Sequence, residues 1–270
     1  ARRAQAVSSR TNESELKRLA RHAANFVDLQ WTLVIRALEN VAPLARGRLL
    51  DVGCGDKPYL QLFEPYVSQY LGVEHEASFR QTASATRTRG PDVFYDGKRL
   101  PFADGEFDTV LSVQTLEHTP APQALLAEMA RVLHPNGVLL LTAPFSFRLH
   151  EEPHDYFRYS PHGLRALCAE AGLVVERCEA MGNLWSLLGH KINSYLALNL
   201  ARFGGLAQGL DKLGHEPQQS ARPRFWLMPF VALGMTSVSV AAKVLDRVAP
   251  DDTESLGFVI VARHKSSMLG

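Results

Sequence analysis

Short apolar runs alternate with helix-like segments through the middle of the chain. The runs that predict strands are residues 48–52, 70–74, 92–96, 107–113, 137–142, 173–176 and 257–263. Each run is short enough for a strand and continuous enough to be buried on both faces. Buried strands that alternate with helices predict a mostly parallel sheet with helices on both faces.

Between these runs, apolar residues recur every three or four positions, which is the period of an amphipathic helix. The segments predicted to be helical are residues 11–40, 121–133 and 161–172. The second ends at Pro135 and Gly137, two residues that terminate helices. The expected fold class is therefore a doubly wound α/β domain with a seven-stranded sheet.

A long apolar stretch, residues 183–249, separates the last two predicted strands. Residues 183–204 predict an amphipathic helix with Leu184, Leu188 and Ile192 on one face. Residues 225–242 contain no charged side chain, and 18 residues lie near the lower limit of about 17 for a membrane span. We expect two helices here, at the carboxyl edge of the sheet.

The apolar stretch has three interpretations. The preferred one is a wall of the substrate pocket, with an acceptor that is partly hydrophobic. The expected lining residues are Trp185, Phe225, Trp226 and Phe230. The others are peripheral contact with a membrane or lipid-linked substrate, and a homodimer face. A single membrane crossing is excluded if residues 257–263 pair in the sheet.

The chain is expected to form one domain over residues 1–270. Its parts are an N-terminal helical cap (11–45), a Rossmann-like core (46–182 and 255–265) and the apolar insertion (183–249). Apolar residues make up 46% of the chain, as in ordinary globular proteins. The 29 basic and 28 acidic residues nearly balance, which argues against nucleic-acid binding. Three cysteines without metal-ligand spacing predict reduced thiols in a cytoplasmic protein. If the insertion contacts a membrane, the expected location is cytoplasmic and peripheral to that membrane.

A glycine turn follows the first predicted strand. Gly53 and Gly55 permit a tight turn and close approach of the backbone to a ligand. Glu74 ends the next strand, where its carboxylate can accept hydrogen bonds from both hydroxyls of a ribose. Pro58 stands where a dinucleotide fingerprint requires glycine, which disfavours a nicotinamide enzyme. A Gly-x-Gly turn taken alone is equally consistent with a structural strand-to-helix turn.

Several motifs in this order resemble the class I S-adenosylmethionine-dependent methyltransferases, closest to the methyltransferase type 11 group. The matching segments are residues 51–55 (DVGCG), 73–74 (VE), 96 with 100–102 and 107–108, 114–118 (QTLEH) and 130–138 (ARVLHPNGV). The resemblance covers residues 49–178 and 257–264. It implies S-adenosylmethionine as cofactor and methyl transfer to a small-molecule acceptor.

The resemblance and the turn together give a set of cofactor contacts. They are Asp51, Gly53, Cys54, Gly55, Glu74, Asp96, Gly97 and Gln114. Asp96 is expected near the adenine amine, and Cys54 is expected to fill space rather than to act as a nucleophile. Lys57 is expected to be solvated rather than to contact the cofactor.

A dense polar and aromatic cluster, residues 150–159, follows the fifth strand and should emerge at the same edge as the cofactor. His154, and after it His150, can accept a proton from an acceptor hydroxyl near neutral pH, and Glu117 and His118 are weaker candidate bases. The side chains expected to contact substrate from this loop are Tyr156, Arg158 and Tyr159.

Two other interpretations of this cluster stay open. A divalent metal could use His150, Glu151, His154 and Asp155, but two histidines suit magnesium poorly, so no metal is expected. Alternatively the loop is a structural lid.

The preferred reaction is methylation of an oxygen on a natural product, sugar or lipid-like acceptor. The alternatives are a catalytically silent cofactor-binding scaffold and the disfavoured nicotinamide oxidoreductase.

Overall fold

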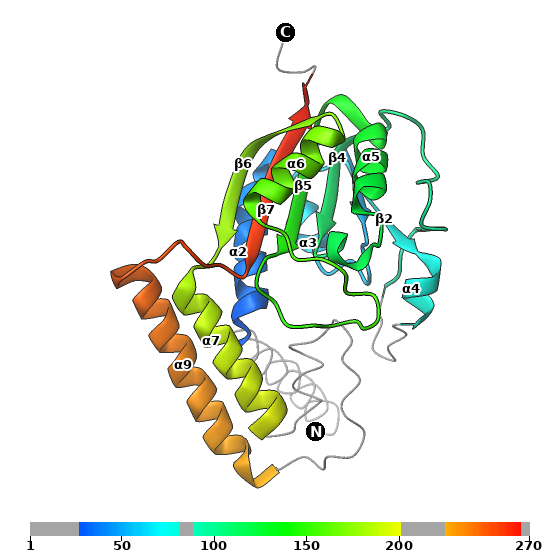
Figure 1. Cartoon of the computed structure of the whole chain (residues 1–270). Helices are drawn as coiled ribbons and strands as arrows, with labels where there is room; N and C mark the ends of the chain where they lie inside the picture. The colour runs from blue at the N-terminus through cyan, green and yellow to red at the C-terminus, as the bar shows by residue number, and fades with distance from the viewer. Residues whose placement is uncertain (1–26, 82–88, 201–224, 266–270) are drawn as a thin grey trace, which may run out of the picture. The chain divides into compact units, whose positions relative to one another are not determined.

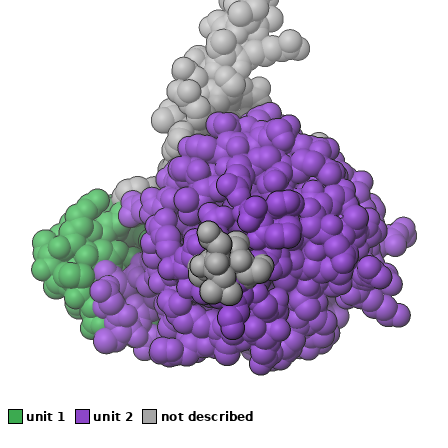
Figure 2. All heavy atoms as spheres, turned by 90° about the horizontal axis from the view of Figure 1, so that it is seen from above, with its two compact units in different colours: residues 1–33, 184–251 green, residues 34–183, 252–270 purple. Residues whose placement is uncertain are grey.

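The computed structural model describes residues 27–81, 89–200 and 225–265. The chain forms two compact units, residues 1–33 with 184–251 and residues 34–183 with 252–270 (Figure 2). The predicted core falls in the second unit and the predicted insertion falls almost wholly in the first. Residues 11–26 of the first predicted helix lie outside the described residues, and the remainder is helix α2 (Leu29–Val41).

A seven-stranded sheet forms the second unit, in the order β3-β2-β1-β4-β5-β7-β6. The strands are β1 (Arg48–Val52), β2 (Gln69–His75), β3 (Val93–Tyr95), β4 (Phe107–Val113), β5 (Leu133–Pro144), β6 (Leu173–Met181) and β7 (Gly257–His264). The first five are parallel, whereas β7 runs antiparallel to both β5 and β6. The predicted mostly parallel, seven-stranded sheet is confirmed.

Helices cover the sheet on both faces (Figure 1). They are α3 (Leu60–Phe63), α4 (Glu76–Gln81), α5 (Pro122–Val132) and α6 (Pro161–Glu170). Met129 of α5 and Leu164 and Cys168 of α6 are fully buried in one core cluster with strand residues Val110 and Leu139. Figure 1 shows α5 and α6 on one face and α3 on the other.

The parallel strands place several loops at one edge of the sheet. β1 pairs in register with β2 and with β4, and β2 pairs with β3. The carboxyl ends of β1 to β5 therefore lie together, and the segments that follow them emerge at the same edge. One of these segments is a short 3-10 helix, η2 (Leu116–His118), after β4.

The first unit contains the two helices predicted in the apolar stretch. α7 (Leu184–Tyr195) continues into the π-helical segment η3 (Leu196–Leu200). The 3-10 turn η4 (Phe225–Leu227) precedes α9 (Met228–Val248). α7 and α9 lie side by side (Figure 1). The amide nitrogen of Leu184 donates to the carbonyl oxygen of Asp251 at 3.1 Å, so the start of α7 adjoins the end of α9.

Small and polar residues form the seam between α7 and α9. A Cβ on Gly189 of α7 would lie 2.9 Å from the Cβ of Ala242 of α9. Asn193 Nδ2 donates to Ser239 Oγ at 2.9 Å across the seam. The side of α7 predicted to be apolar is outside: Leu188 is 43% exposed and Ile192 is 47% exposed. That these helices form a pocket wall stays a prediction.

Candidate active site

The glycine turn follows β1 and is hydrogen-bonded to β2. The amide nitrogens of Gly53 and Cys54 both donate to the carbonyl oxygen of Val73, and Gly53 and Gly55 have φ angles of +78° and +51°. A Cβ on Gly53 would lie 2.3 Å from side-chain atoms of Thr115, whereas a Cβ on Gly55 would meet no atom of the described residues within 4 Å, its chain neighbours aside. Glycine is thus required at position 53 because a side chain there would collide with Thr115. Gly55 borders open space that a ligand can approach.

Glu74 lies directly beside this turn. Its Oε2 accepts from the amide nitrogen of Gly55 at 2.8 Å, and its Oε1 accepts from the amide nitrogen of His75 at 2.9 Å. Burial raises the pKa of Glu74, and the two amide hydrogen bonds oppose that rise. Each carboxylate oxygen can accept a further hydrogen bond. The carboxylate is therefore fixed in place with capacity left for the hydroxyls of a ribose.

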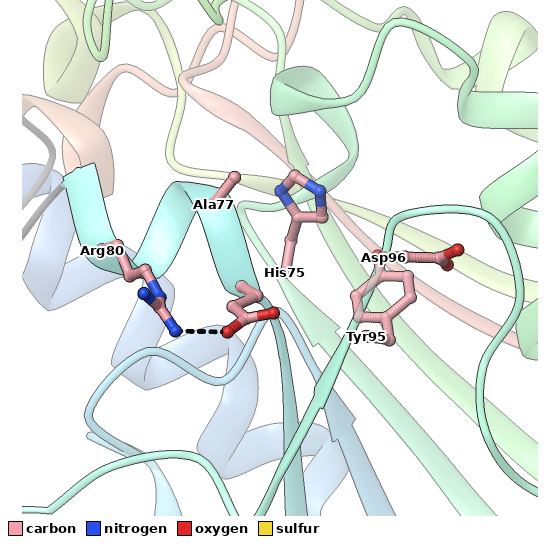
Figure 3. Close-up of a pocket in the computed structure, with 6 residues that line it drawn as sticks. His75, Ala77, Arg80, Tyr95 and Asp96 are labelled. Carbon is pink, nitrogen blue, oxygen red and sulfur yellow. Dashed lines mark hydrogen bonds and ion pairs between the residues drawn. The ribbon is translucent and has the colours of Figure 1, made fainter.

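A pocket of about 440 Å³ opens beyond the ends of β2 and β3 (Figure 3). It is lined by His75, Glu76, Ala77, Arg80, Tyr95 and Asp96. The amide nitrogen of Lys98 donates to Asp96 Oδ1 at 3.0 Å, and hydrogen bonds of this kind lower the pKa of Asp96. The pocket therefore combines aromatic rings with an exposed carboxylate, one strand away from Gly55.

Three other predicted cofactor residues lie inside the protein. Asp51 is 1% exposed and accepts a hydrogen bond from the hydroxyl of Tyr70, and burial raises its pKa to about 7. Cys54 is buried, which raises the pKa of its thiol, and all three cysteines are free. Gln114 Nε2 donates to Thr142 Oγ1 at 3.1 Å. These groups support the turn and the strand ends, and their contact with cofactor stays a prediction.

Lys57 is not solvated, which corrects the sequence-based expectation. Its side chain is 11% exposed, and Nζ lies 2.6 Å from Asp92 Oδ2. The same oxygen accepts a hydrogen bond from the amide nitrogen of Gly72 at 2.7 Å. Asp92 immediately precedes β3, so this ion pair joins the glycine turn to the neighbouring strand. Spacing along the sequence gave no sign of that partner.

The loop after β5 folds back onto η2. The amide nitrogen of Tyr156 donates to the carbonyl oxygen of Glu117 at 2.9 Å, and the hydroxyl of Tyr159 donates to the carbonyl oxygen of Leu116 at 3.0 Å. His118 Nδ1 lies 2.8 Å from the carbonyl oxygen of His154. The loop predicted to approach the active site therefore meets the segment that follows β4.

An ion pair holds the loop together. Arg158 donates through Nη1 to Asp155 Oδ1 at 2.5 Å and through Nη2 to Asp155 Oδ2 at 2.6 Å. Burial favours the neutral acid, but the hydrogen bond from Arg158 prevails and lowers the pKa of Asp155 to about 2. Arg158 and the buried Tyr159, expected to contact substrate, are thus engaged within the loop and η2. Tyr156 is 43% exposed and keeps its place as a candidate substrate contact.

The three candidate bases have different surroundings. His150 is 1% exposed, and burial lowers its pKa to about 4, so its ring is neutral at pH 7 and a weak base. Glu117 is fully buried, and burial raises its pKa to about 7. His154 is partly exposed, and its Nδ1 lies 3.1 Å from the hydroxyl of Tyr156. Among the three, His154 is the one that solvent and an acceptor can reach.

Some residues of the site were absent from the sequence-based set. His75 and Tyr95 line the pocket, and each is adjacent in the sequence to a predicted residue, Glu74 or Asp96. Their positions at the carboxyl ends of β2 and β3 were the available signal. His118, a weaker candidate base from the sequence, lies with Glu117 and His150, and this grouping depends on how the loop folds back, so no local motif predicts it.

Comparisons with known proteins agree with this geometry. Residues 50–141 match the family model of the methyltransferase domain. An uncharacterized methyltransferase of Mycobacterium marinum is 39% identical over 96 residues, covering 35% of this chain and 38% of the relative. An uncharacterized methyltransferase of Mycobacterium tuberculosis is 36% identical over 108 residues, covering 39% and 42%. The aligned part thus spans less than half of each relative.

A solved structure shares the fold over nearly the whole chain. It belongs to the complex of a Haloferax volcanii methyltransferase activator with a methyltransferase, and it aligns with a TM-score of 0.50 at 16% identity. The alignment covers 93% of this chain and 96% of that one. The fold and the glycine turn define a class I methyltransferase domain. Residues 50–141 are similar to the S-adenosylmethionine-dependent methyltransferases, and this similarity implies S-adenosylmethionine as the cofactor.

Proposed function

We propose that the chain transfers the methyl group of S-adenosylmethionine to an oxygen of a small, partly hydrophobic acceptor. The observation that carries this proposal is the open face of Gly55 beside the fixed carboxylate of Glu74. The bound cofactor supplies an electrophilic methyl group on a sulfonium. The comparisons give no support to a nicotinamide oxidoreductase or a catalytically silent scaffold.

The residues present fit the cofactor. A side chain on Gly55 would occupy space that the structure leaves open, and Glu74 has acceptor capacity for ribose hydroxyls. Asp96 and the ring of Tyr95 line the adjoining pocket, where a carboxylate and an aromatic surface suit an adenine amine and ring. These side chains would orient the cofactor and hold it for an in-line displacement.

His154 is the proposed proton acceptor for the acceptor hydroxyl. If its Nδ1–H donates to the hydroxyl of Tyr156, 3.1 Å away, Nε2 carries the lone pair that accepts the proton. His154→Ala should lower turnover by about 10²–10⁴-fold with cofactor affinity nearly unchanged. His162→Ala, at an exposed position of α6, is the control. A loss in His154→Ala under about threefold would favour a structural role instead.

Release of S-adenosylhomocysteine tests the activity itself. The full chain is incubated with S-adenosylmethionine and a panel of hydroxylated acceptors of graded polarity, and each product is examined by mass spectrometry for one added methyl group. Transfer to an acceptor with an apolar portion supports the proposal. Binding of cofactor without release of S-adenosylhomocysteine for any acceptor would favour the scaffold alternative.

We further propose that the α7–α9 pair contacts a lipid surface. Large exposed apolar side chains recur every three or four residues along η4 and α9, except where Ser237 interrupts them. They are Trp226, Phe230, Leu233, Val240, Val244 and Val248. Among the described residues, α9 alone is long and apolar enough to cross a membrane, and only 22% of its apolar window is buried. A core helix of the same composition would be mostly buried.

The distribution of residues in this pair is the one that helices adopt in lipid. Small and hydrogen-bonding side chains such as Gly189, Asn193 and Ser239 form the seam, and large apolar side chains face outward. β7 follows α9 and pairs with β5 and β6, so a single crossing is excluded. We therefore propose that the pair lies in the membrane interface, close to lipid-like acceptors.

Sedimentation with phosphatidylcholine–phosphatidylglycerol vesicles tests the lipid contact. The wild type should sediment with the vesicles, and a Phe230→Ser, Leu233→Ser double variant should remain in the supernatant. Tyr66→Ser, at an exposed aromatic residue of the other unit, is the control and should sediment like the wild type. A wild type that ignores vesicles but forms a dimer that the double variant dissociates would instead assign this face to self-association.

A further inference from the structure

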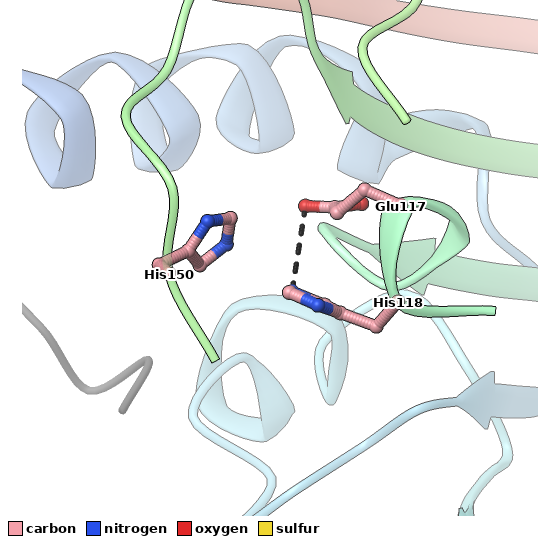
Figure 4. Close-up of side chains that lie close together, drawn as sticks. All are labelled: Glu117, His118 and His150. Carbon is pink, nitrogen blue, oxygen red and sulfur yellow. Dashed lines mark ion pairs between the residues drawn. The ribbon is translucent and has the colours of Figure 1, made fainter. Parts of the chain in front are cut away.

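Three side chains with metal-ligand atoms converge where the loop after β5 meets η2. They are Glu117, His118 and His150 (Figure 4). Their ligand atoms all lie within 4.8 Å of one another, and Glu117 Oε1 lies 3.9 Å from His118 Nε2. Glu117 is 0% exposed, His150 is 1% exposed and the side chain of His118 is 14% exposed, so the cluster is largely shielded from bulk water.

Within the described part of the chain, the atoms that face this space have no hydrogen-bond partner. They are both carboxylate oxygens of Glu117 and the Nε2 atoms of His118 and His150. A buried carboxylate without a donor is unfavourable, and proteins pair such a group or use it to coordinate a metal. Four buried polar atoms that converge without a hydrogen-bond partner therefore indicate a missing ligand.

Hydrogen-bond partners of the Nδ1 atoms fix the tautomers of His118 and His150. His118 Nδ1 lies 2.8 Å from the carbonyl oxygen of His154, which can only accept a hydrogen bond. His150 Nδ1 lies 3.2 Å from both the carbonyl oxygen of Arg148 and Asp155 Oδ2. Both Nδ1 atoms therefore carry the proton, and both Nε2 atoms present a lone pair. Metal-binding histidines are held in this way by outer carbonyl and carboxylate groups.

We propose that Glu117, His118 and His150 bind one divalent transition-metal ion, with zinc the best match. Two imidazoles and one carboxylate are a known three-ligand set for zinc, with a fourth position left for water. Imidazole nitrogen suits zinc and its neighbours in the transition series far better than magnesium. A tetrahedral zinc ion holds its ligand atoms about 3.3 Å apart, so side-chain rotation must bring the outermost atoms, now within 4.8 Å of one another, closer by up to about 1.5 Å.

This set differs from the one considered from the sequence. Asp155 is bound to Arg158 and is placed as an outer partner of His150, and His154 contributes only its carbonyl oxygen. The inference is independent of methyl transfer, because metal binding is measured without cofactor or acceptor. An inactive chain that binds zinc would leave the metal site intact and refute only the proposed function.

Calorimetry on the full, untagged, metal-free chain tests the site with zinc and magnesium salts. We expect one zinc ion per chain and at least tenfold weaker binding of magnesium. Glu117→Gln should weaken zinc binding more than tenfold, and Asp155→Asn should weaken it by about 10–100-fold through His150. His162→Ala, at an exposed histidine, should bind zinc like the wild type.

Cobalt substitution in the wild type keeps the inference testable if a variant fails to fold. Cobalt in a tetrahedral site with two histidines gives a strong visible absorption band, which zinc should displace in a 1:1 ratio. A weak octahedral spectrum, the absence of saturable zinc binding, or equal zinc affinity in Glu117→Gln and the wild type would each overturn the site.

Discussion

Gly55 gives the sharpest test of where the cofactor binds, because a Cβ at that position has open space among the described residues. Its φ angle is +51°, so alanine should cost about 1–2 kcal/mol of backbone strain. A Cβ there has no neighbour within 4 Å in the described part of the chain, apart from the adjoining residues, so we expect no packing penalty beyond the strain. Gly55→Ala should therefore fold, with a free energy of unfolding lowered by about 1–2 kcal/mol.

The same methyl group should obstruct the cofactor. Glycine at this point of the turn allows the backbone to approach a ligand closely. We expect the affinity of Gly55→Ala for S-adenosylhomocysteine to fall at least about tenfold, which corresponds to 1.4 kcal/mol. Isothermal titration calorimetry measures the affinity, and denaturant unfolding measures the stability of the same preparation.

Gly53→Ala is the matched comparison. It has a φ angle of +78°, and its Cβ would lie 2.3 Å from side-chain atoms of Thr115. Strain and overpacking together should lower its free energy of unfolding by about 2–5 kcal/mol. Gly55→Ala with wild-type affinity, or with a loss of stability as large as that of Gly53→Ala, would refute the assignment of the open face to the cofactor.

Three further predictions concern stability. Burial raises the pKa of Asp51 from 3.8 to about 7, so the native state binds this proton more tightly than the unfolded chain does. The resulting stabilisation is complete below about pH 4 and is lost as the pH rises through 7. Unfolding in denaturant should show the wild type losing about 2 kcal/mol more than Asp51→Asn between pH 5 and 7.5, and parallel pH profiles would contradict this. Tyr159→Phe removes the hydrogen bond to the carbonyl oxygen of Leu116 and should cost about 1 kcal/mol in the same assay. Gly189→Val places a Cβ 2.9 Å from that of Ala242 and should cost about 1–3 kcal/mol; unchanged thermal unfolding would show that the α7–α9 seam is not closely packed.

Much of the second unit could be predicted from hydrophobic patterning. Buried parallel strands appear as continuous apolar runs, and all seven were found, although β5 and β6 extend further than their apolar residues indicated. The glycine turn and Glu74 were recognisable because strand ends and their spacing are local features. The antiparallel insertion of β7 between β5 and β6 depends on contacts between distant segments, so strand patterning alone could not give it.

Interactions between distant residues account for what the sequence could not show. The sequence predicted a solvated Lys57, because its ion pair with Asp92 forms only when the sheet brings the two residues together. The apolar pattern of α7 predicted an amphipathic helix but not which side is buried, and hydrogen bonds through Asn193 select the polar side. The cluster of Glu117 with His150 joins segments that are separated by helix α5, strand β5 and a loop, so no motif contains both.

Binding of S-adenosylhomocysteine to the wild type and to Glu74→Ala tests the central claim most directly. The wild type should bind one molecule per chain. Glu74→Ala should bind about 10–100-fold more weakly, because hydrogen bonds to a charged group contribute about 1.5–3 kcal/mol. Absence of binding by the wild type, or equal affinity in the two proteins, would contradict the assignment of this edge of the sheet as the cofactor site.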